Sequence, residues 1–385
     1  QAPRQIAASQ FRSLTSASGR ASDLASNWHE ARDLDFTRRY LAALNATTAA
    51  DVRRAISKLT EDQTTLSILD PEEAPAPAAL KPVSRSRPEP ECITLPNGAT
   101  IALLPDPRVP VISAQVAVRA GLVSETQATA GLNTLLASTL PQGTIRHSAA
   151  ELAGRLESLG ATLGAASGNN ALMVQLSGLS PDLPVLLPLL GEVLAEPALH
   201  GDSIEREKAS QFASLRESQE DPLSTAFRLA RHHLFNGEGY GIPSLGTEQS
   251  LQALNRLALS AHHSRHFQGK NLVLALAGDF EISEASDLLS EAVGKLPEGN
   301  AWSPAPANLA TDFQMEAFLP KKQAVLALAY PGCSALAPER FALRMIQEWC
   351  SDMAGPLFIR IREELGLAYQ VGGTQLHGHD AGLFG

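Results

Sequence analysis

The chain alternates between two hydrophobic patterns, and their order predicts helices and strands in mixed sequence. In short segments every second residue is apolar, which is the period of a strand with one buried face. Longer segments repeat an apolar residue every three or four positions, as an amphipathic helix does. The expected strands lie at residues 93–104 and 161–179 (two hairpins), 111–119 and 271–277. The expected helices lie at residues 131–140, 148–159, 182–195, 202–235, 256–267 and 283–296.

These patterns predict an α+β fold in which a mainly antiparallel sheet is covered by helices, forming one complete domain over residues 92–299. Residues 1–70 are mostly helical and end in an expected strand at 65–69, so they resemble the last part of a similar domain. Six prolines make residues 71–91 an extended linker. A further domain is expected to begin at residue 300. Its expected elements are strands at 324–330 and 367–371 and a helical region at 338–365 that is interrupted at Gly355-Pro356.

An internal repeat supports this division. Leu44-Asn45, a helix and a strand that ends at Asp70 resemble Leu254-Asn255, a helix and a strand that ends at Asp279. Residues 1–70 therefore look like the tail of a domain of the same kind as 92–299. Because 1–70 and 300–385 would each leave an apolar face in water, we expect that they could associate, within one chain or between chains.

Composition narrows the classes of partner. The formal net charge of −10 argues against nucleic acid or an anionic membrane as the main partner. No apolar run reaches about 18 residues, so we expect no membrane span. Three widely spaced cysteines indicate neither a disulfide framework nor a zinc knuckle. The chain opens at Gln1 without a recognisable signal peptide, which leaves the compartment, periplasmic or cytoplasmic, open.

The helix that begins after Gly131 carries the most informative pattern. Thr134 and Ser138 lie four residues apart and share a face with Ala137 beside them. With His at 134 and 138 and Glu at 137, this helix would read H-x-x-E-H, two zinc ligands one turn apart and a carboxylate to activate water. This chain has none of the three.

Five segments in order are similar to the pitrilysin/insulinase family of zinc metallopeptidases, which carry the inverted H-x-x-E-H motif. They resemble the opening hairpin, the active-site helix, the stretch after the third zinc ligand, a late strand ending in Gly-Asp, and the start of a second domain. The segments are Leu95-Pro-Asn-Gly98, residues 131–144, residues 221–247, Leu272–Asp279 and residues 357–369.

The resemblance places the family's two histidines at Thr134 and Ser138 and its glutamate base at Ala137. The third ligand falls near Ser214, and an alignment shifted by one helical turn would place it at Glu217 instead. Catalytic zinc takes three protein ligands, and these positions do not supply them. The resemblance therefore implies an inactive half that binds no metal, with zinc expected elsewhere in the intact protein.

Members of this family are built from four similar domains in two halves, or two subunits, around a chamber. The resemblance implies that the inactive half closes the chamber and contributes an Arg and a Tyr to peptide substrate, and that Arg362 and Tyr369 match this pair. Both can donate to a peptide carbonyl or oxyanion. The expected partners are a peptide and the zinc-bearing N-terminal half of the same protein. The alternative is a non-enzymatic scaffold of the same fold.

A histidine cluster offers a separate candidate. His262 and His266 lie four residues apart on an expected helix and could bind a metal on one face. No carboxylate or cysteine lies near them in sequence. We favour a solvated helix face for this cluster.

Overall fold

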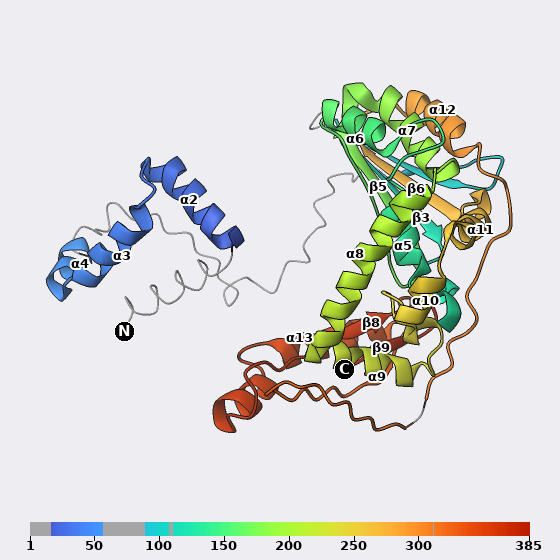
Figure 1. Cartoon of the computed structure of the whole chain (residues 1–385). Coiled ribbons are helices and arrows are strands. Elements are labelled where there is room, and N and C mark those ends of the chain that lie inside the picture. The colour runs from blue at the N-terminus through green and yellow to red at the C-terminus, as the bar shows by residue number, and fades with distance from the viewer. Residues whose placement is uncertain (1–16, 57–88, 108–110, 311) are drawn as a thin grey trace, which may run out of the picture. The chain divides into compact units, whose positions relative to one another are not determined.

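The computed structural model describes residues 17–56, 89–107, 111–310 and 312–385 (Figure 1). The chain divides into two compact units, residues 1–85 and 86–385. The described residues of the first unit form the helices α2 (Ala17–Ala31), α3 (Phe36–Ala46) and α4 (Ala49–Ile56). Thr48 and Asp51 cap the start of α4, since the Thr48 N–H donates to the Asp51 carboxylate at 2.9 Å and the Asp51 N–H to Thr48 Oγ1 at 3.3 Å. The predicted strand at 65–69 lies outside the described residues.

The second unit is built on a six-stranded sheet with the order β1-β2-β6-β3-β5-β4. Its strands are β1 (Glu91–Thr94), β2 (Thr100–Pro105), β3 (Val111–Arg119), β4 (Thr162–Ser167), β5 (Ala171–Leu179) and β6 (Leu272–Gly278). Every neighbouring pair is antiparallel except β2 with β6. The predicted mainly antiparallel sheet and both predicted hairpins are confirmed.

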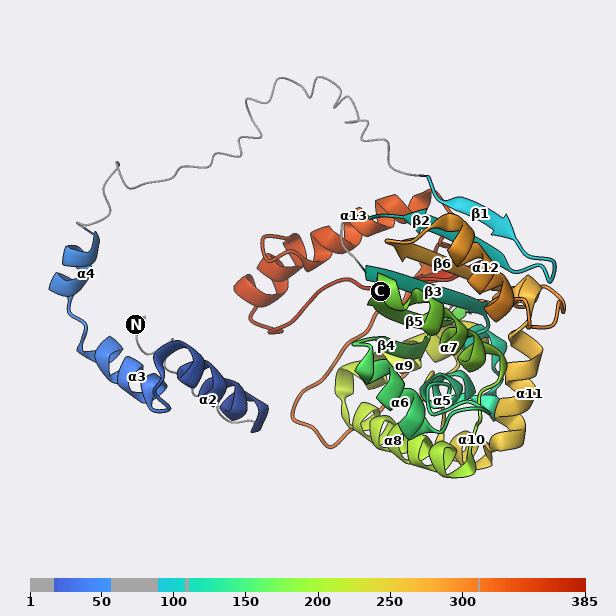
Figure 2. The ribbon, with the colours of Figure 1, turned by 90° about the horizontal axis from the view of Figure 1, so that it is seen from above.

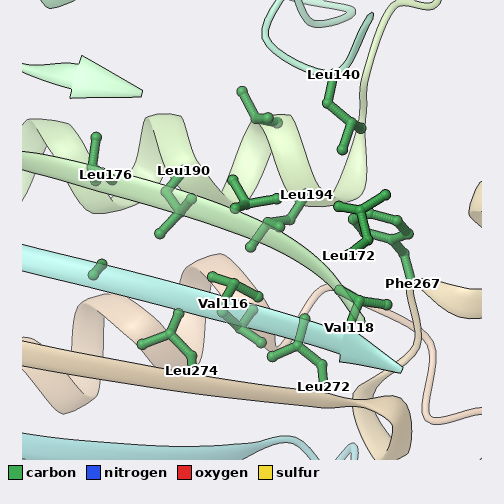
Figure 3. Packing of buried hydrophobic residues seen from close by; sticks show 14 of the residues in the cluster. Val116, Val118, Leu140, Leu172, Leu176, Leu190, Leu194, Phe267, Leu272 and Leu274 are labelled. Carbon is green, nitrogen blue, oxygen red and sulfur yellow. The ribbon is translucent and has the colours of Figure 1, made fainter. Parts of the chain in front are cut away.

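One face of this sheet is buried and the other is open. Along β3, Ile112, Ala114, Val116 and Val118 are buried, whereas Ser113 and Gln115 between them are exposed. Helices lie against the buried face (Figure 2), and Leu190 and Leu194 of one of them meet strand residues such as Leu172 and Leu274 (Figure 3). The covering helices include α5 (Leu132–Thr139), α6 (Ala149–Ser158), α7 (Leu183–Ala195) and α12 (Ile282–Val293).

Helices α7 and α12 pack at a very close distance. A Cβ atom added to Gly191 on α7 would lie 2.7 Å from the Cβ and 2.8 Å from the Cα of Ala292 on α12. The small residues at this point allow the two backbones to approach each other.

The predicted single helix at 202–235 is wrong, because Pro222 divides it into α8 (Gly201–Glu220) and α9 (Pro222–Leu234). Proline has no N–H and begins a helix readily. Asp221 caps the new helix by accepting from the Ser224 N–H at 2.7 Å. Helices α10 (Glu248–Ala253) and α11 (Arg256–His266) lead into β6. In the part of the chain that the structure describes, no helix is long and apolar enough to cross a bilayer.

The C-terminal segment forms a smaller layer. Residues 301–329, a strap without helix or strand among its described residues, lead to a three-stranded sheet of order β7-β9-β8. Its elements are β7 (Tyr330–Gly332), α13 (Glu339–Ser351), the π-helical η7 (Phe358–Glu364), β8 (Gln375–His377) and β9 (Gly382–Phe384).

Two predicted strands of this segment differ from the structure. The strand predicted at 324–330 is reduced to β7, because β9 pairs with residues 330–332. The strand predicted at 367–371 is replaced by β8 at 375–377. The Leu367 N–H still donates to Ile361 O at 2.9 Å, so the chain is held to the end of η7 where the strand was expected. The interrupted helical region at 338–365 is confirmed as α13 and η7.

The small sheet repeats part of the large one. Strands β3, β5 and β4 are antiparallel neighbours in that order, and so are β7, β9 and β8. Helices α5 and α6 lie between β3 and the β4–β5 hairpin, and α13 and η7 lie between β7 and the β8–β9 hairpin. The helix before each hairpin is followed by a left-handed glycine, Gly160 (φ +59°) or Gly366 (φ +61°), in the same Leu-Gly context.

Candidate functional site

Helix α5 is held firmly against the sheet. Leu132, Leu135 and Leu136 are buried, and Leu140 at its C-cap is fully buried. Gly131 at the N-cap has φ +87°, and a Cβ there would lie 2.8 Å from Gln211 Nε2 and 2.9 Å from Leu245 O. Only glycine fits such a backbone and such a contact. The helix is therefore a well-packed element, with the start where its sequence pattern predicts it.

The side chains at the three motif positions of α5 contact other atoms of the same domain. Thr134 donates its hydroxyl to Ser244 O at 2.7 Å, and Ser138 donates to Leu135 O at 3.0 Å. Ala137 is buried. The hydroxyls at 134 and 138 are thus bound to backbone carbonyls, and the position between them carries a methyl group.

The fourth position lies on α8, which packs against α5. Ser214 and the alternative Glu217 are both exposed. Two hydroxyls, a methyl group and a serine do not form a donor set for zinc, which prefers imidazole, thiolate and carboxylate. Among the described residues, no three His, Cys, Asp or Glu side chains are placed so that they could hold a metal ion. These positions do not fit zinc, and no catalytic step through zinc follows from them.

A buried carboxyl group holds the start of α5. Glu125 accepts from the Gly131 N–H at 2.8 Å, the Asn133 N–H at 2.6 Å and Asn133 Nδ2 at 3.0 Å. Burial raises the pKa of Glu125 to about 7, although each of these hydrogen bonds opposes the rise. The carboxylate satisfies N–H groups that a helix start leaves unpaired.

The histidine cluster is buried, so the predicted solvated helix face is wrong. His263 and His266 are buried and His262 is half-buried. Each donates to an oxygen: His262 Nε2 to Asn133 Oδ1 at 3.0 Å, His263 Nε2 to Leu194 O at 2.9 Å and His266 Nδ1 to Arg119 O at 3.0 Å. Burial lowers the pKa of His262 to about 3 and of His263 to about 4, so these rings are neutral. The helix turns this face inward because α11 packs on α5.

The structure brings Arg362 and Tyr369 together. The guanidinium carbon of Arg362 lies 4.4 Å from the centre of the Tyr369 ring and 4.6 Å from that of Phe358. Its Nε is 3.5 Å from Glu363 Oε1. The Tyr369 side chain is 81% exposed. A guanidinium stacked on aromatic rings keeps a fixed orientation, and its N–H edge and the phenol stay available to a ligand.

Sequence patterns did not reveal the polar network that supports α5. Its central member, Asn133, donates to Gly121 O at 2.8 Å as well as to Glu125, and accepts from His262. A signal was present, since Asn133 interrupts a run of leucines at a position that the helical period places inside. Pattern alone does not say which groups satisfy such a residue, because Glu125 and His262 reach it from other segments.

Comparisons of the sequence with known proteins all point to one protein family. The model of the insulinase family (peptidase family M16) matches residues 100–248, and the model of the peptidase M16 inactive domain matches residues 253–385. An uncharacterized zinc protease of Rickettsia bellii is 24% identical over 294 residues, which cover 75% of this chain and 71% of that protein. Subunit 1 of the human mitochondrial cytochrome b-c1 complex is 26% identical over 210 residues, covering 54% of this chain and 44% of the subunit.

The fold has the same relatives. The crystal structure of a peptidase M16 inactive domain from Pseudomonas fluorescens superimposes with a TM-score of 0.68 at 23% identity. The superposition covers 77% of this chain and 73% of that one.

Proposed function

Because the chain belongs to the pitrilysin/insulinase family of zinc peptidases (M16), we propose that residues 92–385 are a non-catalytic portion of a zinc-dependent endopeptidase. In this proposal the portion closes the chamber in which peptides are cleaved and contacts the peptide. Zinc is bound by the N-terminal half of the same protein. That half supplies the Lewis acid and the activated water.

The observation that carries the proposal is the state of α5. The helix packs its leucine face into the core, yet Thr134, Ala137 and Ser138 occupy its motif positions and two of them bond to backbone carbonyls. A helix kept in place without its ligands supports a role for the fold apart from chemistry. The open face of the large sheet exposes polar Ser113 and Gln115 together with apolar Val111 and Val273, which supports a wall that faces water and peptide.

Arg362 and Tyr369 are the proposed peptide contacts. Both donate hydrogen bonds, and together they can bind a peptide carbonyl or the oxyanion that forms from it. The contact of Arg362 with the rings of Phe358 and Tyr369 supports this role, because it orients the guanidinium before any ligand arrives.

The domain division into 1–70, 71–91, 92–299 and 300–385 is part of the proposal. Its support for the last region is the repeated strand order, in which β7, β9 and β8 follow the pattern of β3, β5 and β4. By this reading residues 300–385 are the first part of a second domain of the same kind.

The test uses the whole protein with its zinc-bearing half and an unstructured peptide. We expect Arg362→Ala and Tyr369→Phe each to lower kcat/KM by about tenfold or more, with zinc content unchanged. Arg360→Ala is the matched control for the first variant, because Arg360 lies on the same η7 and pairs with Glu364 at 2.5 Å. Tyr330→Phe is the control for the second. A kcat/KM equal to that of the controls would show that the assigned role is wrong.

A scaffold without enzymatic activity is the second candidate. The likeness to subunit 1 of the human cytochrome b-c1 complex favours it. The sequence and the zinc content of the whole protein distinguish the peptidase from the scaffold. An H-x-x-E-H helix with bound zinc supports the peptidase, and its absence from the whole protein together with a stable partner complex supports the scaffold.

A further inference from the structure

A small junction joins the C-terminal segment to the large domain. Its apolar part is separate from the main core, and its buried residues are Leu234, Phe235 and Tyr240 on one side and Ala381 and Leu383 on the other. Partly buried side chains of the strap pack against them. The strap is fastened beside it, since the Ala310 N–H donates to Leu234 O at 2.8 Å and Asn236 Nδ2 to Asn308 O at 3.2 Å. The junction therefore joins both the strap and the C-terminal sheet to the large domain.

The hydroxyl of Tyr240 lies at the centre of this junction. It donates to Asn170 Oδ1 at 2.6 Å and accepts from the His379 N–H at 2.7 Å. Asp380 Oδ1 lies 3.4 Å away, and Asp380 Oδ2 accepts from the Ala307 N–H at 2.6 Å. One hydroxyl thus links the domain, the C-terminal sheet and the strap.

The two turns that this hydroxyl connects are equivalent in the repeat. Asn170 lies at the turn between β4 and β5, and His379 at the turn between β8 and β9. Gly378 precedes His379, and a Cβ atom there would overlap the Tyr240 ring. The second turn is shaped to receive the ring and its hydroxyl.

The junction is hollow on one side of Tyr240. A cavity of about 270 Å³ lies beside Tyr240, between the strap and the segment around Gly237–Ile242. The strap itself is held at the junction by the bond from the Ala310 N–H to Leu234 O of α9 and by the partly buried side chains of Leu309 and Phe313. The polar contacts of Tyr240 add to this attachment and join the β8–β9 turn to the large domain. Arg231 supports Tyr240 from behind, with Nη2 2.9 Å from Tyr240 O and 3.0 Å from Asn169 Oδ1.

We propose that Tyr240 is a positioning residue, whose hydroxyl holds the β8–β9 turn on the β4–β5 turn and so sets where the Arg362 and Tyr369 pair stands relative to the large domain. The consequence for Arg362 and Tyr369 rests on the proposed function, whereas the position of the segment does not. Without the hydroxyl the segment stays folded and attached by the strap, but takes a range of orientations.

The test measures a distance, which a loss of stability alone does not change in the folded protein. Spin labels are placed on native Cys92, which is exposed on β1, and on Glu339→Cys at the start of α13, with Cys333→Ser and Cys350→Ser in every chain. We expect a narrow distance distribution with Tyr240 and one about twofold broader or more in Tyr240→Phe. Tyr330→Phe is the matched control and should leave the distribution narrow.

Gly378→Ala provides a second route to the same state, because it displaces the turn while keeping the hydroxyl. We expect it to broaden the distribution to the same degree, and hydrogen exchange of the His379 amide to rise about tenfold or more in both variants, with exchange in β3 and β5 unchanged. Unchanged distributions in Tyr240→Phe would overturn the proposal. If Tyr240→Phe keeps the narrow distance distribution and Arg362→Ala loses peptide cleavage, the proposed function stands and this inference is refuted. If Tyr240→Phe broadens the distribution and Arg362→Ala cleaves the peptide as before, this inference stands and the proposed function is refuted.

Discussion

At the start of α5, burial acts in opposite directions on neighbouring groups. It raises the pKa of Glu125 to about 7 and lowers that of His262 to about 3, and the two are joined through Asn133. Both shifts keep the network neutral. As the pH rises from about 4.5 to 7, stability from Glu125 is lost, because the unfolded chain releases its proton first. As the pH rises from about 3 to 6.5, the stability contributed by His262 increases, because the unfolded chain releases a proton from His262 that the folded chain does not hold. His263, whose pKa burial lowers to about 4, adds to this gain, so in the wild-type chain the loss from Glu125 offsets only part of the gain from the histidines.

Glu125→Gln exposes this compensation. Glutamine keeps one acceptor for the N–H groups at the start of α5 and does not titrate. The loss of stability that Glu125 causes between about pH 4.5 and 7 is therefore absent from the variant. We expect the variant, compared with wild type, to gain on the order of 2–3 kcal/mol in free energy of unfolding on going from pH 5 to pH 8. Urea unfolding at a series of pH values measures it. The matched control is Glu217→Gln on the exposed face of α8, and an equal pH profile for all three proteins would contradict the assignment.

The motif positions of α5 allow a constructive test. If Thr134, Ala137, Ser138 and Ser214 stand where the family has its zinc site, T134H/A137E/S138H/S214E supplies three ligands and a base. We expect this variant to retain about one zinc per chain after dialysis, by elemental analysis. T134H/A137E/S138H without S214E should lose its zinc. Equal retention by both would point to Glu217 as the third ligand.

At the scale of elements, the close crossing of α7 and α12 leaves no room for an added side-chain atom at Gly191. Gly191→Ala places a methyl group within overlap distance of Ala292, and overpacking of this kind costs about 1–3 kcal/mol. Denaturant unfolding should show this loss, and adding Ala292→Gly should restore part of it by removing the opposing Cβ. A loss that is purely additive in the double variant would mean that the two residues do not meet.

Periodicity predicted most elements of the large domain and their order, because its strands and helices have one clearly apolar face. It failed where a boundary depends on a partner. Pro222 divides a continuous helical pattern. Residues 324–329 alternate like a strand, although the pairing with β9 begins only at residue 330. The motif positions of α5 could be located by resemblance. The contacts of Thr134 with Ser244 and of Tyr240 with Asn170 could not, because each joins segments far apart in sequence.

At the scale of the molecule, the two repeats bury their helices very differently. Leu135 and Leu136 on α5 are fully buried, whereas Phe341, Met345 and Trp349 on α13 are 64%, 76% and 62% exposed. The large domain therefore carries the main core, and the C-terminal segment depends on the junction at Tyr240 for its place. The rest of the chain thus covers the helix of the second repeat much less than that of the first.

The place of β6 in the sheet has a further consequence, for biosynthesis. This strand, residues 272–278, lies between β2 and β3, which precede residue 120. At a synthesis rate of about 5–20 residues per second, the ribosome needs roughly 8–30 s to proceed from the end of β3 to the end of β6. During that time the facing edges of β2 and β3 have no neighbour and can pair with other nascent chains. The emerging polypeptide is thus expected to need a holding chaperone until its last central strand has been made.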